Sequence, residues 1–352
     1  MTAHDTPVSQ SHDVRNGEPF VSVVIPARNE ELNLAACLDS MVHQTGIAFE
    51  IIVVDDNSTD RTAEIAAAYA DVQVITPGPL PAGWSGKSHA ISKAIPYAHG
   101  NWFLFTDADT IHRPNSIEKG VNEAIDYGAD LLSYSPYQLT ESFWERLLQP
   151  IVFAELSREF NYSDVSDPSS PSAAANGQYI LMRKKTYLDV GGHAAIKGAL
   201  LEDVALARAV KQTGVKLRFR YGPDIVSARM YRNFSQIWEG WTKNLTRLFP
   251  SVLSLACRRL LESIAVVGGV LLCLAGLLHH SAIAASLGLC AAASSFAFTV
   301  RRFKNAQYGL GTTLISIPGL PLFSALLVNS FITTKLLKRS VWKGRTYSND
   351  LA

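Results

Sequence analysis

The sequence lacks the features that would indicate zinc binding, disulfide bonds or a partner attracted by overall charge. Only four of its 352 residues are cysteines (Cys37, Cys257, Cys273 and Cys290), and they show no CxxC or Cys/His spacing. Basic and acidic side chains nearly cancel to a formal net charge of +1, so no global field favours nucleic acid. We therefore expect a reducing compartment, no zinc and no nucleic-acid partner.

An apolar leader is also missing from the start of the sequence. The first 19 residues are polar and contain no hydrophobic core, which excludes a secretory signal or a membrane anchor within them. We expect residues 1–19 to form a loose, disordered tail. The whole chain does not have a disordered composition, because 47% of its residues are hydrophobic and 18% are charged.

Between residue 20 and about residue 131, short segments rich in β-forming residues alternate with helical stretches. The strand candidates are residues 20–25, 49–54, 72–75 and 102–106, and the helix candidates include residues 30–42 and 62–69. Such alternation predicts βαβ units, a mostly parallel sheet, and a ligand crevice at the carboxyl ends of the strands. We expect an α/β domain over residues 20–250, with a more mixed second half.

The first pair of acidic residues, Asp55 and Asp56, comes directly after a strand candidate. The polar turn that continues through Ser58 and Thr59 suits recognition of the base and ribose of a nucleotide. Alternatively, these side chains turn the chain and cap the next helix, as residues of these types commonly do. The two roles are compatible.

A second acidic pair, Asp107 and Asp109, ends the strand candidate at residues 102–106. Side chains two residues apart on an extended backbone point to the same side, so both carboxylates can face one ligand. Hard divalent cations prefer oxygen ligands and keep open positions for phosphate. A DxD motif alone is weak evidence, but its place after a strand and beyond the first pair predicts Mg²⁺ or Mn²⁺ held against a diphosphate.

A third acidic pair, Glu202 and Asp203, precedes an amphipathic helix candidate. Negative charge at a helix N-terminus is favourable in its own right, which is one explanation of the pair. The other is a general base that takes the proton from an acceptor hydroxyl. The presence of the two earlier acidic pairs favours the base.

A glycine-rich stretch at residues 83–90 lies between the first two acidic pairs and carries Trp84 and Lys87. The lysine can contact a diphosphate, and the indole ring can pack on a sugar or a lipid. The stretch is not a P-loop, because the GxxxxGK[ST] spacing would need glycine at the position of Pro81. A plain surface turn is the alternative.

Two stretches downstream have apolar residues at helical spacing. Residues 234–248 place Trp238 and Trp241 on an apolar stripe with Lys243 off it, and residues 143–160 show a looser version. Packing on the protein's own core would explain both. Their proximity to the apolar segments that follow favours helices at a membrane interface.

After residue 260 the sequence becomes almost free of charge. Residues 263–278 and 282–300, with their flanks, are each long enough to span about 30 Å of hydrocarbon, and a short link joins them as a hairpin at residues 261–300. Basic residues flank its outer ends: Arg258 and Arg259 before it, and Arg301, Arg302 and Lys304 after it. The positive-inside rule then predicts a multi-pass protein of the inner (cytoplasmic) membrane with its catalytic domain in the cytoplasm.

The last apolar segment of the membrane region at residues 261–336 conflicts with this charge rule. If residues 310–334 simply spanned, the basic tail at residues 337–352 would lie outside. Pro318, Gly319 and Pro321 also interrupt the centre of the segment. We favour a broken segment that re-enters and returns to the cytoplasmic face, with its irregular backbone shielded by protein.

These motifs, in this order, resemble the family 2 glycosyltransferases. The resemblance rests on residues 23–30 (VVIPARNE), the Asp55-Asp56 turn, the DxD motif and Glu202-Asp203. It implies a Rossmann-like α/β domain of the GT-A type followed by transmembrane helices, a UDP-sugar donor, a metal at Asp107 and Asp109, and Asp203 as the base with Glu202 as second choice. The donor-binding residues that it implies are Pro26, Ala27, Arg28, Glu30, Asp55, Asp56, Trp84, Lys87 and Asp107.

Within that family, the sequence looks most like the lipid-directed branch that glycosylates carotenoids, such as the diaponeurosporenoate and hydroxychlorobactene glycosyltransferases. The likeness lies in residues 83–90, 229–231 and 239–243 and in the terminal WKGRTY at 342–347. It implies an inverting transfer of a hexose to a lipid acceptor in the bilayer. Candidates for contact with the acceptor or a phosphate are Trp238, Trp241, Lys243, Trp342 and Arg345, although membrane-edge anchoring would also explain the last two.

One element of the processive enzymes in this family is missing. The (Q/R)xxRW motif would fall at residues 235–241, which contain no Arg-Trp pair. We therefore predict one sugar per acceptor, with a carotenoid, hopanoid or similar lipid as the acceptor. Polyprenyl phosphate is an alternative acceptor because residues 335–345 are basic, and a non-catalytic nucleotide-binding membrane scaffold is an alternative function, although a scaffold would not need a base.

Overall fold

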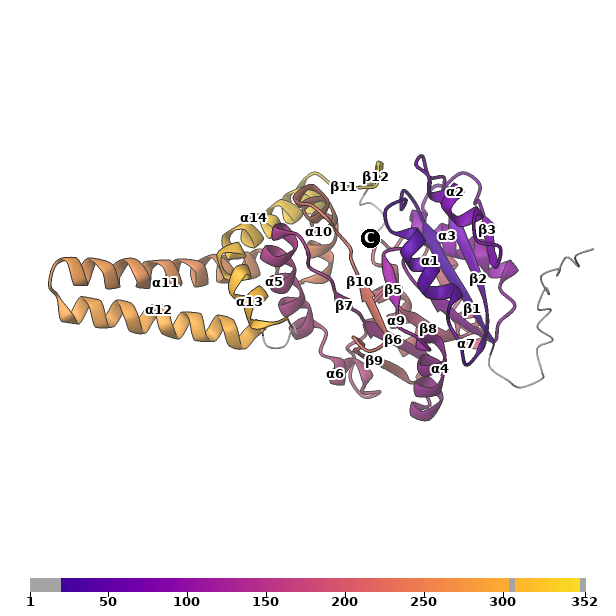
Figure 1. The fold of residues 1–352 in the computed structure, drawn as a ribbon, viewed down its shortest axis with the longest axis horizontal. Helices are drawn as coiled ribbons and strands as arrows, with labels where there is room; N and C mark the ends of the chain where they lie inside the picture. Colours follow the sequence, from indigo (N-terminus) through magenta and orange to yellow (C-terminus); the bar gives the residue numbers. More distant parts are fainter. Residues whose placement is uncertain (1–19, 304–307, 349–352) are drawn as a thin grey trace, which may run out of the picture.

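The computed structural model describes residues 20–303 and 308–348, arranged in three parts along the long axis of the molecule (Figure 1). An α/β domain forms one end, two long helices project from the other end, and shorter helices lie between them. The predicted tail at residues 1–19 lies outside the described residues, as do residues 349–352.

A seven-stranded sheet in the order β3-β2-β1-β4-β8-β6-β9 forms the centre of the α/β domain. Strand β8 runs antiparallel to both neighbours, and the other pairs are parallel, so the predicted mostly parallel sheet is confirmed. The strands are β1 (Phe20–Ala27), β2 (Ala48–Asp55), β3 (Val72–Ile75), β4 (Trp102–Phe105), β6 (Leu131–Ser135), β8 (Ile180–Arg183) and β9 (Leu217–Tyr221).

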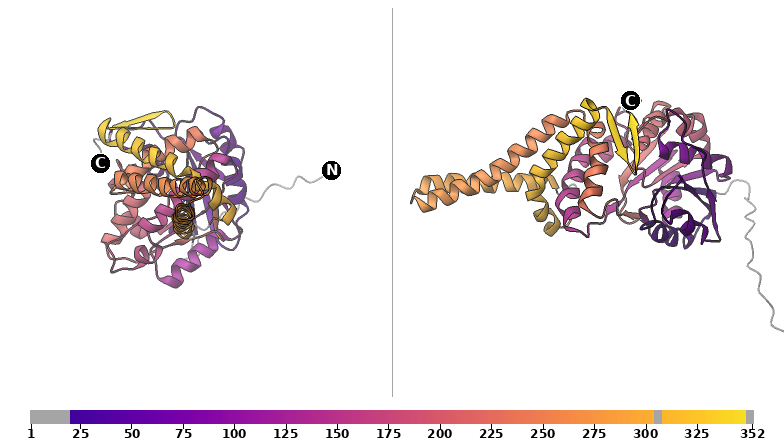
Figure 2. Two further views of the ribbon diagram at one scale, coloured as in Figure 1. Left: turned by 90° about the vertical axis from the view of Figure 1, so that its left-hand side faces the viewer. Right: turned by 90° about the horizontal axis from the view of Figure 1, so that it is seen from above.

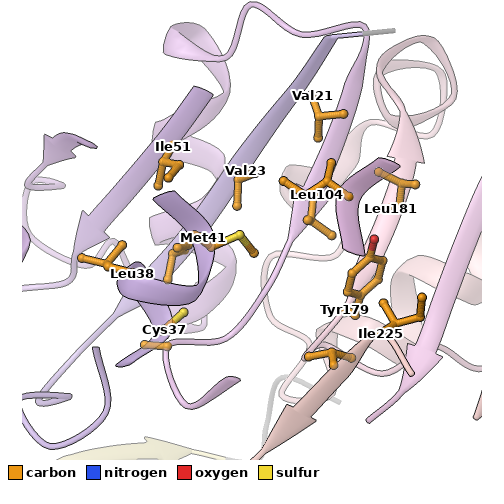
Figure 3. Packing of buried hydrophobic residues seen from close by; sticks show 14 of the residues in the cluster. Val21, Val23, Cys37, Leu38, Met41, Ile51, Leu104, Tyr179, Leu181 and Ile225 are labelled. Atoms are coloured by element: carbon orange, nitrogen blue, oxygen red, sulfur yellow. The ribbon is translucent and has the colours of Figure 1, made fainter. Parts of the chain in front are cut away.

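Helices cover both faces of this sheet, which is why its central strands are hydrophobic without alternation. Figure 3 shows Leu38 and Met41 packed with Val23 and Leu104 in the core on the first face. That face carries α1 (Leu34–Val42), α2 (Thr62–Ala67) and α4 (Ser116–Tyr127). The opposite face carries α3 (Gly86–Ala94), η1 (Ile95–Tyr97), α6 (Tyr162–Ser166), α7 (Lys184–Asp189), α8 (Gly192–Ala195) and α9 (Glu202–Gln212).

A small second sheet in the order β5-β10-β7 connects the DxD motif to the chain that leads into the helical part. Its strands are β5 (Thr110–His112), β7 (Tyr137–Gln138) and β10 (Val226–Ala228). Ala228 pairs with Thr110, and the N–H of Arg229 donates to the carbonyl of Asp109 at 3.0 Å. This pairing fixes the DxD motif beside the start of the helical part.

The middle layer contains the two predicted amphipathic helices, α5 (Phe143–Glu159) and α10 (Phe234–Leu248). A capping box begins α5, because Ser142 accepts from the N–H of Glu145 and the Glu145 carboxylate accepts from the N–H of Ser142. Ile151 of α5 and Trp241 of α10 belong to a third buried core, separate from the two cores of the sheet. Each helix therefore packs one face on the protein itself.

The third apolar segment is broken into α13 (Leu310–Ser316), η3 (Ile317–Gly319), α14 (Leu320–Phe331) and η4 (Ile332–Leu336), a π-helical turn. The break falls at Pro318 and Gly319, as the sequence predicts. A side chain at residue 319 would not fit, because its Cβ would lie 2.5 Å from the carbonyl oxygen of Leu147 on α5. The interrupted backbone thus lies against protein.

Helices α11 (Val252–Leu278) and α12 (Ala282–Phe303) form the projecting antiparallel hairpin (Figure 1). By length and composition, both are able to cross a membrane, as is the segment Leu310–Leu336. Glycines allow the two helices to approach closely, since a Cβ at Gly276 or Gly288 would meet the backbone of the opposite helix.

Two of the basic residues that flank the hairpin are buried. Arg259 and Arg302 are only 4% and 6% exposed. Both form ion pairs with Glu155 of α5, at 3.3 and 3.2 Å, and with Glu262 of α11. Through these ion pairs, Arg259 of α11 and Arg302 of α12 join the hairpin to α5.

The basic tail, for which the sequence predicted no secondary structure, forms two strands. Strands β11 (Arg339–Trp342) and β12 (Arg345–Ser348) form an antiparallel hairpin, with Trp342 opposite Arg345. Figure 2 shows this hairpin extending from the end of the helical part toward the α/β domain. The sequence pattern missed the hairpin because its turn, Lys343-Gly344, lies within a basic stretch that has no apolar alternation.

Candidate functional site

A cavity of about 690 Å³ lies where the carboxyl ends of β1 and β4 meet α9, α10 and the C-terminal hairpin. Residues from all three predicted acidic pairs line it, although they are far apart in sequence. The predicted site residues in its wall are Pro26, Ala27, Arg28, Glu30, Asp56, Lys87, Asp107, Asp109, Glu202, Asp203, Trp241, Lys243, Trp342 and Arg345.

Lys87 connects two of the acidic pairs. Its ammonium lies 2.6 Å from Asp107 and 2.7 Å from Glu202. Burial alone would lower the pKa of Lys87, yet Asp107, Glu202 and Asp203 together raise it, so the side chain stays charged. The same ammonium lowers the pKa of Glu202 against the effect of burial. Helix α3 holds Lys87 in place at its N-terminal turn, which is capped by Ser85.

Asp109 is the DxD carboxylate without a basic side chain within ion-pair distance in the described part of the chain. Its Oδ1 accepts a hydrogen bond from Nε2 of Gln178 at 3.2 Å. Burial, followed by the charges of Asp107 and Glu30, raises the pKa of Asp109 to about 7. A cation placed beside this carboxylate would therefore be strongly favoured.

The carboxylates of the DxD motif fit a hard divalent cation. Among the described residues, no cluster of three or more His, Cys, Asp or Glu side chains could hold a metal alone. Two carboxylates with open remaining positions are, however, the arrangement that Mg²⁺ takes when substrate phosphates supply further oxygens. Asp107 and Asp109 would thus hold a metal together with a diphosphate.

Asp203 combines a position at the start of α9 with a raised pKa. Burial and the neighbouring charge of Glu202 raise the pKa of Asp203 to about 6, and Lys87 moderates the rise. One of its oxygens accepts from the N–H of Gly177 at 3.1 Å, and the other accepts from the N–H of Val204 at 2.8 Å. A fixed carboxylate with a pKa near neutrality meets the requirement for a general base.

A buried polar network under the DxD motif holds its backbone in place. The hydroxyl of Thr110 donates to the carbonyl of Asp107 at 2.7 Å, and Nε2 of His112 lies 3.0 Å from the hydroxyl of Thr106. Burial lowers the pKa of His112 to about 3, so the ring is neutral. The hydroxyl of Thr106 also donates to the carbonyl of Gln178. This bond positions Gln178, whose side chain donates to Asp109.

The C-terminal hairpin closes the opposite wall of the cavity. Arg345 pairs with Asp56 through both carboxylate oxygens, and Nη2 to Oδ1 measures 3.0 Å. Lys343 pairs with Glu30, and its backbone N–H donates to Glu239 at 3.2 Å. Arg28 adds a bond to the carbonyl of Lys343 and donates to that of Asp56 at 2.6 Å. The hairpin therefore contacts the donor-binding residues that the family resemblance implies.

Trp342 stands between the hairpin and α10. Its ring lies 4.5 Å from the ammonium of Lys243 and packs against Tyr231, whose ring in turn packs against Trp241. Within the described ranges, Lys243 has no carboxylate partner at ion-pair distance. Burial lowers the pKa of Lys243 to about 8, although Glu202 opposes that effect.

Three predicted site residues lie outside the cavity wall. Asp55 is buried beneath the turn and accepts from the N–H of Ser58 at 3.2 Å, the local capping role considered for it. Trp84 packs its ring edge-on against His89 on α3. Trp238 packs on Phe234 and lies partly buried against the third core.

Sequence analysis did not single out Gln178, Thr110 or Asn244. Gln178 lies just before β8, and only the antiparallel pairing of β8 with β4 brings it beside Asp109. Thr110 follows the DxD motif directly, and that position was the one available signal for its role. Asn244 lies in the cavity wall three residues after Trp241, and its Oδ1 is buried without a hydrogen-bond partner in the described structure.

Comparison with known proteins agrees with this arrangement. The family described as glycosyl transferase family 2 matches residues 22–187. The chain is 29% identical over 339 residues to the 4,4'-diaponeurosporenoate glycosyltransferase of Staphylococcus aureus (strain USA300). This alignment covers 93% of this chain and 88% of the relative. The likeness therefore extends beyond the sheet domain into the apolar helices.

Among solved structures, a mannosyltransferase from Pyrobaculum calidifontis, PcManGT, in complex with GDP-Man and Mn²⁺, aligns with a TM-score of 0.52 and 17% identity. The alignment covers 91% of this chain and 88% of that structure. Together with the family match, it shows that the sheet domain has the GT-A Rossmann-like fold, as the sequence resemblance implied.

Proposed function

Since residues 22–187 form a family 2 glycosyltransferase domain, we propose that this protein transfers one hexose from a UDP-sugar to a hydrophobic acceptor in a membrane. The observation that carries the proposal is the convergence of Asp56, Asp107, Asp109 and Asp203 on one cavity next to the membrane helices. The relative from S. aureus is named for a carotenoid acid, which supports a carotenoid-like acceptor.

In this proposal, the donor lies across the carboxyl ends of β1 and β4. Arg28 and Asp56 contact the nucleoside, and Asp107 and Asp109 would hold Mg²⁺ or Mn²⁺ against the diphosphate. A divalent cation there would supply positive charge to offset the negative charge on the departing UDP. Lys87 is the second positive group close to the diphosphate, because it already lies beside Asp107.

Asp203 then removes the proton from the acceptor oxygen while that oxygen attacks the anomeric carbon. The carbon–oxygen bond to UDP breaks from the opposite face, so the configuration inverts and the product is a β-glycoside. Glu202 keeps Lys87 in place and raises the proton affinity of Asp203. The absence of an Arg-Trp pair in residues 235–241 supports the addition of a single sugar.

The membrane arrangement belongs to the same proposal. Helices α11 and α12 span the inner membrane with the catalytic domain in the cytoplasm, and the segment Leu310–Leu336 re-enters and returns. Two features support re-entry: the segment is interrupted at Pro318, and it leads directly into β11, which contributes to the cytoplasmic site. The segment Leu310–Leu336 is also more buried than α11 or α12, which further supports re-entry.

Donor turnover tests the function directly. Purified protein with Mn²⁺ is expected to release UDP from at least one UDP-hexose, faster when membrane lipids are added, with a glycolipid detected by mass spectrometry. UDP binding without any turnover in the presence of lipids would instead support a nucleotide-binding scaffold.

Polyprenyl phosphate is the second candidate acceptor. The observation that favours it is Lys243, a largely buried ammonium near Asp203 that has no carboxylate at ion-pair distance in the described residues. Comparison of a polyprenyl phosphate with the corresponding neutral alcohol as acceptor distinguishes the two. Preference for the phosphate, lost in Lys243→Met, would establish this alternative.

A further inference from the structure

The cavity has an apolar arm that the donor chemistry does not use. It lies between the C-terminal halves of α5 and α10. Phe153 and Leu156 on α5 form one wall, continued by Phe160 just past the end of that helix, and Trp241, Asn244 and Leu248 on α10 form the other. Residues at these spacings share one helix face, so the two walls face the same space.

The two helices touch at the other end of the arm. Trp144 and Phe234, near their N-termini, lie with ring centroids 4.8 Å apart, and Phe153 meets Trp241 at 5.9 Å. The open part of the arm therefore begins beyond Phe153 and Trp241. It runs toward the C-terminal ends of both helices.

The C-terminal end of α10 lies at the foot of the apolar hairpin. Helix α10 ends at Leu248, and α11 begins only a few residues later at Val252. On the other wall, Glu155 of α5 is paired with Arg259 of α11 and Arg302 of α12. The apolar arm thus joins the reaction centre to the place where the chain enters the bilayer.

We propose that this arm is the passage by which the acceptor, a slender and mainly hydrocarbon lipid, brings its polar end from the bilayer to Asp203. The inference rests on the proposed transferase function and names the route and shape of the acceptor. The side chains at Leu156 and Phe160 contact its hydrocarbon part. The whole cavity, of about 690 Å³, has the size of a pocket for one small ligand, so most of a long acceptor stays in the membrane.

Asn244 selects for the polar end of the lipid. Its Oδ1 is buried in the apolar stripe without a partner in the described structure, and buried amides normally form hydrogen bonds. Trp241, in the preceding turn, has a buried Nε1–H that likewise has no partner there. A hydroxyl or similar end group can donate a hydrogen bond to Oδ1 of Asn244 and accept one from Nε1–H of Trp241.

Photolabelling tests the passage. The probe is a long-chain alcohol with a diazirine next to its hydroxyl, added to phosphatidylcholine vesicles that contain the full-length protein. Peptide mapping should place labels on α5 and α10 within residues 153–160 and 241–248. Leu156→Trp and, as a second variant, Ser157→Phe should remove most of this label and most transfer to lipid. Leu261→Trp, on the exposed side of α11, is the matched control and should change neither.

Donor hydrolysis in the same samples separates the possible failures. Leu156→Trp is expected to keep hydrolysis of the UDP-sugar in water, which also shows that the variant is folded. Label confined to the outer faces of α11 and α12, or unaffected by both passage variants, would overturn the passage. Label in the passage with no donor turnover in the unaltered protein would overturn the transferase function and leave a lipid-binding site.

Discussion

The guanidinium of Arg345 forms an ion pair with the carboxylate of Asp56, a residue 289 positions earlier in the chain. Asp56 is 4% exposed, and its partner reaches it from the turn of the C-terminal hairpin. A second pair between Lys343 and Glu30 fixes the same hairpin to the end of β1. Strands β11 and β12 therefore complete the wall of a cavity that begins in the first βαβ unit.

Replacement of Arg345 by alanine should weaken donor binding. The variant loses a charge-assisted bond that holds the hairpin in the cavity wall, so we expect the donor KM to rise by roughly tenfold, the equivalent of about 1.4 kcal/mol. Steady-state kinetics with a UDP-sugar measures this. Arg339→Ala, at the exposed other end of β11, is the control and should leave KM unchanged. An equal rise in both variants would mean that the hairpin does not act through Asp56.

Two carboxylate variants should separate the proposed base from the metal ligand. Asp203→Asn should lower kcat by roughly 10²–10⁴-fold while UDP binding is kept, because only proton removal is lost. Asp109→Ala should weaken Mn²⁺-dependent UDP binding itself. Calorimetric titration of UDP with and without Mn²⁺ supplies the binding data. Equal loss of UDP binding in the two variants would contradict both roles.

The pH dependence of the reaction should show the raised pKa of Asp203. Below about pH 6, the carboxyl is protonated and cannot accept a proton, whereas above it the base is available. We therefore expect the acid limb of the kcat/KM profile to bend near pH 6, well above the ordinary value of about 3.9 for an aspartic acid. A limb that continues to fall only below pH 4 would exclude Asp203 as the base.

Removal of one charge from the foot of the hairpin should destabilise the protein. Glu155→Gln leaves Arg259 and Arg302 with one fewer carboxylate in a buried setting, a change of about 3–5 kcal/mol in comparable cases. Thermal unfolding in detergent should show a clear fall in the transition temperature. Arg158, half exposed and 3.9 Å from Glu155, provides the control. Arg158→Ala should change the transition little, and a similar effect of both variants would refute a structural role for the buried network.

Cysteine labelling should decide the path of the third apolar segment. In a background without the native cysteines, Ser348→Cys is expected to react with a membrane-impermeant maleimide only from the cytoplasmic side. The reason is that β12 belongs to the same site as the sheet domain. A cysteine at Ser281, in the link between α11 and α12, is the control and should react only from outside. Labelling of both positions from outside would show that the segment spans.

The sequence by itself determined the sheet domain and much of the site. Its strands are continuous apolar runs that end in acidic residues, and the ends of parallel strands meet on one edge, so Asp56, Asp107 and Asp109 could be expected together. The apolar hairpin was equally visible, because two long stretches without charge are joined by a short polar link. These features depend on local patterns, which can be recognised in a short window of the sequence.

Tertiary structure alone decided which predicted residues reach the cavity and which partners they meet. Asp55 and Trp84 have suitable chemistry but point elsewhere, and Gln178 reaches Asp109 only because β8 pairs antiparallel with β4. Arg345 meets Asp56 through the folding back of the whole helical part. Such contacts arise from the packing of distant segments, and spacing along the chain carries no information about which side chains that packing brings within hydrogen-bond distance.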